Sequence, residues 1–331
     1  MAGGRLDSGV FEQGGARYQG WTNNIAIANA TTTTTNDSIK ITGANGTDLG
    51  PNNYGWVTLP STSAPGQLVT FSVTANVTIN LTGAHWGLGT TGDYTDYILS
   101  VYAINNAGSL KWGVGSVPNH KKILDADDTA TATSVSTVEK IFVNSALNAN
   151  SSALEIGWFL ADFDDTGGAA EDLWAVQTGL NEIMMGERPS DLWQIFKPTG
   201  TWIANSTYTG LWKRDYNFLS LDLHIALAGA PTATSLQINL PSGFVIDTNQ
   251  LLSSEATGTP FPSWGQLLDA GTRAYMGGVD YTTTTAVNII CIGADLTFTY
   301  RLSVSETAPM TWANNDRVRI QAWNLPIVGW R

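Results

Sequence analysis

The sequence predicts an all-β protein with two antiparallel β-sandwich domains in series, jelly-roll-like in topology. Only 13% of the 331 residues are charged, about half the usual share, whereas Thr, Asn, Gly and the 13 Trp are abundant. Thr and Trp favour a pleated, half-buried surface, and Asn and Gly close turns. Several segments also alternate between apolar and polar residues, which is the period of a strand with one buried face.

The chain divides by composition into an arm and two domains. Its first 20 residues are rich in Gly and show no apolar periodicity, so we expect residues 1–25 to form an extended arm. A polar, Pro-containing segment at 187–198 interrupts the strand pattern further along. We therefore expect one β-sandwich over 26–190 and a second β-sandwich over 191–331.

The strongest strand signal in the first domain is Leu68–Leu81, in which apolar residues alternate with Thr, Ser and Asn. Because fourteen residues exceed the usual strand length, we expect a bend or bulge within it. Alternation over Tyr97–Asn105, then an Asn-Ala-Gly turn and Leu110–Val114, predicts a hairpin. Further strands are expected at 38–42, 55–59, 135–143 and 153–163.

Helical spacing occurs in one stretch, 169–185, where apolar residues recur every three or four positions. We expect a short helix or an irregular connection there. Beyond residue 198 the strand pattern restarts and turn residues separate the segments. Strands are expected at 201–204, 208–213, 218–228, 235–240, 245–247, 273–279, 286–292, 296–304 and 317–323.

Charge and composition exclude several classes of partner. A net charge of −12 disfavours contact with phosphate backbones, so nucleic-acid binding is not expected. No apolar run approaches the ~20 residues of a membrane span, and no apolar core of a signal peptide follows Met1. We therefore expect synthesis in the cytoplasm without membrane insertion. The one cysteine, Cys291, excludes a disulfide within the chain, and its apolar neighbours predict a buried, inert thiol.

An acidic cluster follows the strand expected at 153–163. Asp162, Asp164, Asp165 and Asp172 could supply oxygen ligands for calcium, and this is the only metal site that the residues suggest. The spacing is not that of an EF-hand, because Leu173 stands where the twelfth ligand should be Glu. The alternative is an exposed acidic turn. No other cofactor is expected.

The residues offer no catalytic machinery. The three His are far apart, no Gly-x-Ser-x-Gly elbow occurs, and nothing places two carboxylates across a groove as a glycoside hydrolase requires. We therefore expect no enzyme and assign no catalytic residues. A hydrolase acting on surface polysaccharide, through carboxylates such as Asp96 and Asp164, stays as a third hypothesis.

Aromatic residues are the remaining candidates for binding. Aromatic rings beside Asn and Asp can stack on sugar rings while the neighbours hydrogen-bond the hydroxyls. Two groups fit this description and are our candidates for glycan contact: Trp86, Tyr94 and Tyr97, and then Trp202, Tyr208 and Trp212. The alternative is that these aromatics fill the sandwich cores or a subunit interface.

The C-terminal part carries a series of short motifs. In chain order they are Phe-Lys-Pro-Thr-Gly-Thr-Trp (196–202), Tyr-Thr-Gly-Leu-Trp-Lys-Arg (208–214), the alternating strand 218–228, Leu-Pro-Ser-Gly-Phe (240–244), Ala-Pro-Met-Thr-Trp-Ala (308–313), and Asp316. This order resembles the β-rich C-terminal modules of tailed-bacteriophage fibre and related virion-surface proteins. The resemblance covers about residues 196–331.

The resemblance implies a function of assembly. Proteins of this kind are commonly homotrimers, attached to the virion by an N-terminal segment, so the expected partners are further copies, capsid or tail proteins, and host surface glycans. The chain would then be a structural protein on the virion surface, either a tail fibre or a capsid decoration protein that takes part in host attachment. A stand-alone lectin-like module and a capsid cement protein without a receptor role stay as alternatives.

Overall fold

The computed structural model confirms the all-β class with antiparallel sheets, in which only Thr129–Ala130 and Ile141–Val143 pair in parallel among the described strands. No α-helix occurs among the residues that it describes, and short 3-10 turns stand at Ala44–Gly46 and Thr248–Gln250. None of these described segments is a helix long and apolar enough to cross a membrane. The described residues are 9–13, 16–30, 38–64, 66–81, 86, 88, 94–116, 123–124, 129–131, 137–148, 150–164, 173–177, 183–185, 192–215, 217–251, 259–294 and 299–328.

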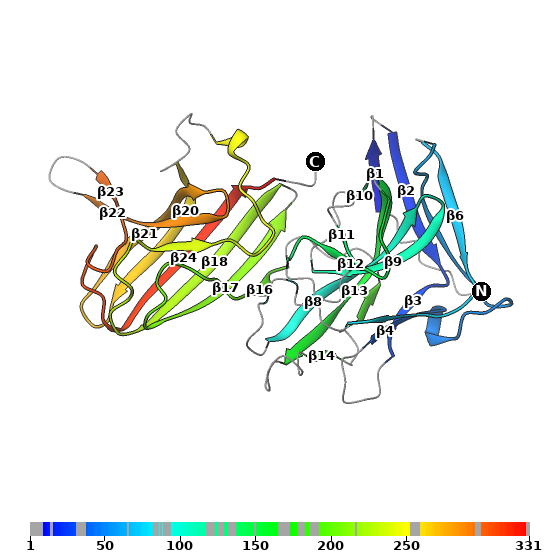
Figure 1. The fold of residues 1–331 in the computed structure, drawn as a ribbon, viewed down its shortest axis with the longest axis horizontal. Helices are drawn as coiled ribbons and strands as arrows, with labels where there is room; N and C mark the ends of the chain where they lie inside the picture. Colours follow the sequence, from blue (N-terminus) through cyan, green and yellow to red (C-terminus); the bar gives the residue numbers. More distant parts are fainter. Residues whose placement is uncertain are drawn as a thin grey trace. The chain divides into compact units, whose positions relative to one another are not determined.

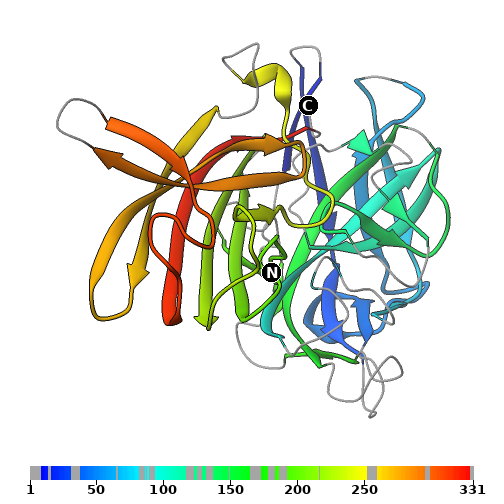
Figure 2. The ribbon, with the colours of Figure 1, turned by 60° about the vertical axis from the view of Figure 1, so that its left-hand side comes forward.

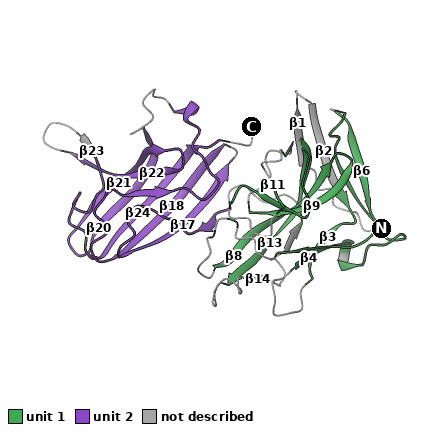
Figure 3. Ribbon diagram, viewed as in Figure 1, with its two compact units in different colours: residues 1–189 green, residues 190–331 purple. Residues whose placement is uncertain are grey.

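The chain forms two compact units, residues 1–189 and 190–331, which are shown in separate colours in Figure 3. The division falls one residue before the second domain expected from the sequence. Each unit is described by itself below.

The largest sheet of the N-terminal unit is built on two long strands, β8 (Tyr94–Asn106) and β13 (Ser151–Asp164), which pair along most of their length (Figure 1). β8 forms the expected hairpin with β9 (Ser109–Gly115) through a turn at Ala107 and Gly108, which both have positive φ. Short strands complete this sheet: β10 (Ile123–Leu124), β11 (Thr129–Ala130), β12 (Ile141–Val143), β14 (Leu173–Val176) and β15 (Ile183–Met185).

Two smaller sheets continue one another in the same unit. The first has the order β1 (Gly9–Gln13), β2 (Ala16–Asn23), β5 (Gly55–Pro60) and β6 (Leu68–Val73), and the second has the order β3 (Ala26–Asn29), β4 (Ser38–Thr42) and β7 (Val77–Asn80). β3 follows β2 in the chain, and β7 follows β6. β5 pairs with β2 and β6, and β4 pairs with β3 and β7, so β4 and β5 form the central line of the two sheets. Residues 43–54 leave this line between the end of β4 and the start of β5, and we call this connecting segment the excursion.

Both faces of the long strands are buried. Tyr97, Leu99 and Val101 of β8 belong to a core shared with β3–β7, whereas Tyr102 and Ile104 belong to a second core with Leu124, Ile141 and Val143. The first core is the interior of a sandwich between the large sheet and the two smaller ones. The second core explains why β8 and β13 are apolar on both faces, which is the pattern of strands covered on both sides.

The structure corrects two expectations for this unit. Residues 9–13 and 16–23 form an antiparallel hairpin that joins the sheet through β5, so 9–25 is not an extended arm. Within the stretch of helical spacing, Leu173–Val176 and Ile183–Met185 are strands that pair with β13. Because these segments pair with β13, tertiary context overrides the helical spacing of their apolar residues. The break expected within Leu68–Leu81 lies at residues 74–76, between β6 and β7.

The C-terminal unit is one curved antiparallel sheet (Figure 2). Its strands are β16 (Gln194–Phe196), β17 (Ser206–Asp215), β18 (Phe218–Ala228), β19 (Gln237–Asn239), β20 (Pro260–Asp269), β21 (Arg273–Thr283), β22 (Ala286–Ala294), β23 (Thr299–Ser303) and β24 (Asn314–Pro326). The order is β16-β17-β18-β24-β20-β21-β22-β19, and β23 also pairs with β22. The segment after β16 bridges to β19, because the Thr201 N–H donates to the Gln237 carbonyl over 3.0 Å. The two edges of the sheet are thereby connected.

The motifs of this unit are explained by packing. Gly200 and Gly210 have no room for a side chain, since a Cβ at Gly200 would lie 2.4 Å from the Gln237 carbonyl oxygen and one at Gly210 would lie 2.6 Å from the Phe196 ring. The rings of Trp202 and Trp312 meet edge to face at 5.2 Å in the core. Asp316 accepts hydrogen bonds from the N–H groups of Ala313 and Ala270 and so ties two turns together.

Candidate functional site

The structure buries most of the aromatic residues that the sequence offered for glycan contact. Trp86, Tyr97, Trp202 and Trp212 are 0–1% exposed, so they cannot stack on a sugar at the surface. Tyr94 and Tyr208 are half-buried, and burial raises the pKa of each hydroxyl to about 12. The hydroxyl of Tyr208 donates to the Trp202 carbonyl over 2.9 Å. Burial therefore contradicts surface glycan contact for Trp86, Tyr97, Trp202 and Trp212, which fill the cores, whereas glycan contact stays a prediction for Tyr94 and Tyr208.

The acidic cluster is only partly described. Asp162 lies at the end of β13 and accepts hydrogen bonds from the Asp96 N–H (3.1 Å) and from Nε2 of Gln177 (2.7 Å). The same amide nitrogen donates to Asp96 over 2.9 Å, so two carboxylates share one neutral donor. Asp164 lies on the same face of β13, whereas Asp165 and Asp172 lie outside the described residues. The described residues contain no group of three acidic, His or Cys side chains that could hold a metal.

A surface of the C-terminal unit that the sequence did not single out carries large exposed apolar side chains. Trp264, Leu268 and Met276 are 50%, 37% and 52% exposed. They lie on neighbouring strands, because Trp264 and Leu268 belong to β20 and Met276 pairs with Gln266 of the same strand. Soluble proteins rarely leave such side chains grouped on one sheet face.

Two arginines extend this surface across the sheet. Leu268 pairs with Arg317 of β24, and Gln266 pairs with Arg319, so the exposed side chains of both arginines project from the same face. Arg319 lies 3.6 Å from Asp222, whereas Arg317 has no ion pair within the described chain. We call the surface formed by Trp264, Leu268, Met276, Arg317 and Arg319 the β20–β24 face.

Strand β20 was missed in the sequence because prolines at 260 and 262 and glycine at 265 resemble a turn segment. The residues of β20 do alternate as those of a strand with one buried face: Phe261, Gly265 and Leu267 are buried, whereas Trp264 and Gln266 are exposed. Gly265 is required by packing, since a Cβ there would lie 2.4 Å from the Arg319 carbonyl oxygen.

A second exposed aromatic group lies in the N-terminal unit. The rings of Tyr54 and Trp56 meet edge to face with centroids 5.2 Å apart, and the side chains are 41% and 39% exposed. Trp56 is on the outer face of β5, where its paired neighbours are Asn23 of β2 and Ser72 of β6, both exposed. We call Tyr54, Trp56, Asn23 and Ser72 the Tyr54–Trp56 platform.

The excursion over 43–54 is tied to the sheet on both sides. Asn24, with φ of +52°, donates from its amide to the Asn53 side chain and the Tyr54 carbonyl, and its oxygen accepts from the Ala44 N–H. On the other side, Asn76 accepts from the Leu49 N–H over 2.9 Å. Asn24 lies between β2 and β3, and Asn76 lies between β6 and β7. Their side chains therefore hydrogen-bond backbone groups of the excursion that do not pair with a neighbouring strand.

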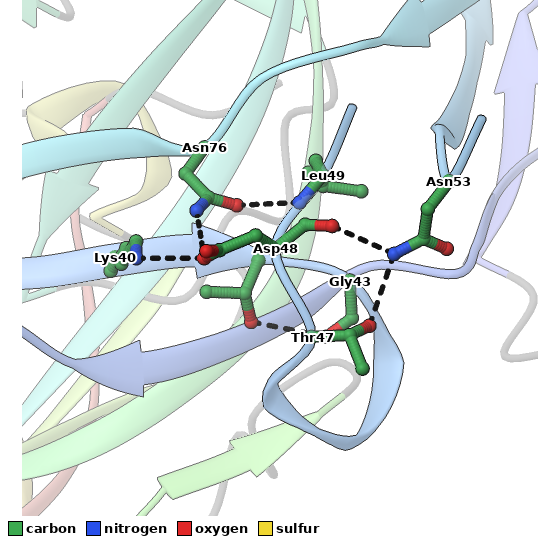
Figure 4. Close-up of polar contacts among 8 residues, drawn as sticks. Lys40, Gly43, Thr47, Asp48, Leu49, Asn53 and Asn76 are labelled. Atoms are coloured by element: carbon green, nitrogen blue, oxygen red, sulfur yellow. Dashed lines mark hydrogen bonds and ion pairs between the residues drawn. The ribbon is translucent and has the colours of Figure 1, made fainter. Parts of the chain in front are cut away.

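Contacts within the excursion make it rigid (Figure 4). Nδ2 of Asn53 donates to the Asp48 carbonyl (2.8 Å) and to the Thr47 hydroxyl (3.2 Å). Lys40 forms an ion pair with Asp48 over 3.1 Å, and together with the Asn76 amide it lowers the pKa of Asp48. Tyr54 is thus carried by a segment whose shape is fixed by side-chain hydrogen bonds.

Comparison of the chain with protein-family models, with curated proteins and with solved structures finds no match.

Proposed function

We propose that this chain is a non-enzymatic structural protein of a tailed-phage virion, displayed on the particle surface as an oligomeric fibre or decoration subunit. The observation that carries the proposal is the β20–β24 face, because a Trp, a Met and two Arg exposed together are the residue types enriched at protein interfaces. The motif resemblance of 196–331 gives the virion context.

The occupant that fits this face is a second copy of the chain. Residues 1–189 contain 8 basic and 18 acidic residues, a net charge of −10, whereas residues 190–331 contain 8 and 10, a net charge of −2. An arginine-bearing face on the less acidic unit therefore complements the acidic unit of another copy. Such a contact joins two different surfaces, and contacts of this kind form closed rings or open filaments. We propose a ring of three copies.

The test is the solution mass of the full chain by light scattering, before and after Trp264→Asp. We expect a trimer for the parent protein and dissociation for the variant, because the new carboxylate must be desolvated on an interface centred on that ring. Ile203→Asp is the matched control, since Ile203 is 82% exposed and outside the β20–β24 face. A parent monomer at all concentrations and ionic strengths would contradict self-association, and a Trp264→Asp trimer would contradict the assignment to this face.

A second candidate function is favoured by a specific observation. The Tyr54–Trp56 platform offers exposed aromatic rings on the N-terminal unit, which suits a lectin-like module. A monomer that binds glycan would favour the stand-alone lectin, and a monomer that associates only on its particle would favour the cement protein. Release of reducing ends from surface polysaccharide, lost in Asp96→Asn, would favour the hydrolase.

A further inference from the structure

Two exposed rings in the N-terminal unit are surrounded by hydrogen-bonding groups that have no internal partner. Within the described chain, no hydrogen bond is formed by the Tyr54 hydroxyl or by the side chains of Asn23 and Ser72. Paired residues on adjacent strands have Cβ atoms about 5 Å apart, so the Asn23 and Ser72 side chains flank the Trp56 ring on either side.

The chemistry of these neighbours defines the ligand. Asn supplies both donors and acceptors, and Ser and Tyr hydroxyls supply either, so the set suits groups that also donate and accept. The charged side chains nearby, Lys40 and Asp48, pair with each other and leave little net charge. An anionic ligand would also be repelled by the net −10 of residues 1–189. The ligand is therefore uncharged and polar, with an apolar face to cover the rings.

We propose that the Tyr54–Trp56 platform binds an uncharged pyranose unit of a surface glycan. The C–H face of the sugar would cover the Trp56 ring, the Tyr54 ring would border it edge-on, and Asn23 and Ser72 would hydrogen-bond the equatorial hydroxyls. This burial would remove apolar area that the two rings, 41% and 39% exposed, now present to water.

The platform is organised before any ligand arrives. The backbone of Tyr54 is held by Asn24, whose amide donates to its carbonyl over 3.1 Å. Gly55 lets the chain pass against the connection between β2 and β3, because a Cβ there would lie 2.3 Å from Cδ1 of Ile25 and 2.8 Å from the Asn24 carbonyl oxygen. Rings on a fixed backbone lose little conformational entropy on binding, and this is the property that favours weak, hydrogen-bonded ligands.

The experiment is binding of the full chain to an array of neutral oligosaccharides, namely gluco-, galacto- and chito-hexaoses, followed by calorimetry on the best of them. We expect one neutral class to bind and Trp56→Ala to weaken it at least tenfold. Tyr54→Phe, which keeps the ring, should retain most of the affinity. Trp323→Ala is the matched control, because Trp323 is 37% exposed but lies in the C-terminal unit.

Three outcomes would overturn the proposal: no binding to any neutral oligosaccharide, binding to anionic polysaccharide alone, or equal affinity in Trp56→Ala. Trp56→Phe keeps the test decisive if the alanine variant fails to fold, since it preserves an aromatic face and is expected to lose less affinity than Trp56→Ala. The proposal does not depend on self-association. Light scattering reports the β20–β24 face and glycan affinity reports the platform, so either can fail alone.

Discussion

The two exposed aromatic surfaces differ in what surrounds their rings. Trp264 pairs with Gln321 and shares the β20–β24 face with Leu268, Met276 and two arginines, whereas Trp56 on the platform pairs with Asn23 and Ser72. Aliphatic and guanidinium groups are suited to a protein partner that excludes water, and uncharged polar groups are suited to hydroxyls. The same residue type therefore indicates different ligands, and the neighbours decide between them.

The surfaces also differ in how their backbones are held. The β20–β24 face lies on regular paired strands, and its positions follow from the ladder. The platform lies where the central line of a sheet is interrupted, and its geometry depends on Asn24, Gly55 and the excursion. Single substitutions should therefore damage the platform more than the face.

The largest expected effect is at Gly55. In Gly55→Ala the new Cβ meets Ile25 and the Asn24 carbonyl at less than contact distance, so we expect the N-terminal unit to lose about 3 kcal/mol. Chemical denaturation measures this loss. Gly50→Ala is the control, because a Cβ there meets nothing within 4 Å. If both variants lose the same stability, the close approach of Gly55 to Asn24 and Ile25 does not constrain the fold.

The next effect is at Asn24. Asn24→Ala removes three hydrogen bonds and places a non-glycine residue that lacks a polar side chain at φ of +52°, so we expect a loss of about 2 kcal/mol. Asn24→Gly separates the two causes, since it tolerates the backbone conformation but lacks the bonds. It should recover part of the loss. Glycan affinity should fall in both variants, and unchanged affinity would show that the platform does not need its support.

Sequence alone predicts the regular strands well, since β18 spans Phe218–Ala228 as expected and the Tyr97–Asn105 hairpin forms. It does not predict burial of a Trp outside an alternating strand. Trp202 is buried because Gly200 lets two chain segments approach, a contact between residues far apart in sequence. Trp56 could have been identified, because its position between the apolar Gly55 and Val57 places it on the outer face of its strand.

A smaller effect concerns a carboxylate beside the β20–β24 face. Asp280 of β21 is buried, its Oδ1 has no hydrogen-bond partner among the described residues, and burial raises the pKa of its carboxyl. A raised folded-state pKa means that stability falls as pH rises through that value, so the ionised group destabilises the protein at pH 7. We expect Asp280→Asn to gain roughly 1 kcal/mol at pH 7 and nothing at pH 3.

Thermal unfolding at the two pH values measures this gain. Asp222→Asn is the control, because Asp222 accepts from Nε2 of Gln321 over 2.8 Å and pairs with Arg319. That variant should be neutral or less stable at pH 7. A loss of stability in Asp280→Asn at pH 7 would contradict the penalty assigned to the buried carboxylate.

The smallest expected effect is the change in protein stability when the pH is lowered, which we assign to a histidine paired with Arg319 of the β20–β24 face. His224 of β18 pairs with Arg319 and Thr209, and burial together with Arg317 and Arg319 lowers the pKa of its imidazole, while Asp222 opposes them. As the pH falls, the imidazole is therefore protonated at a higher pH in the unfolded chain than in the folded one. The contribution of the neutral imidazole to stability is therefore fully present above about pH 6.5, and it declines as the pH falls toward the folded-state pKa.

His224→Gln should flatten the decline between pH 7.5 and 5.5, a range in which carboxylates with ordinary pKa values stay ionised. Denaturation midpoints of the parent and variant across this range measure the difference. An identical slope in both would show that other groups cause the decline. Because the added proton would sit beside two arginines, the same titration should tighten the contact of the face with an acidic partner while it weakens the isolated unit. Light scattering at pH 5.5 separates these opposite effects.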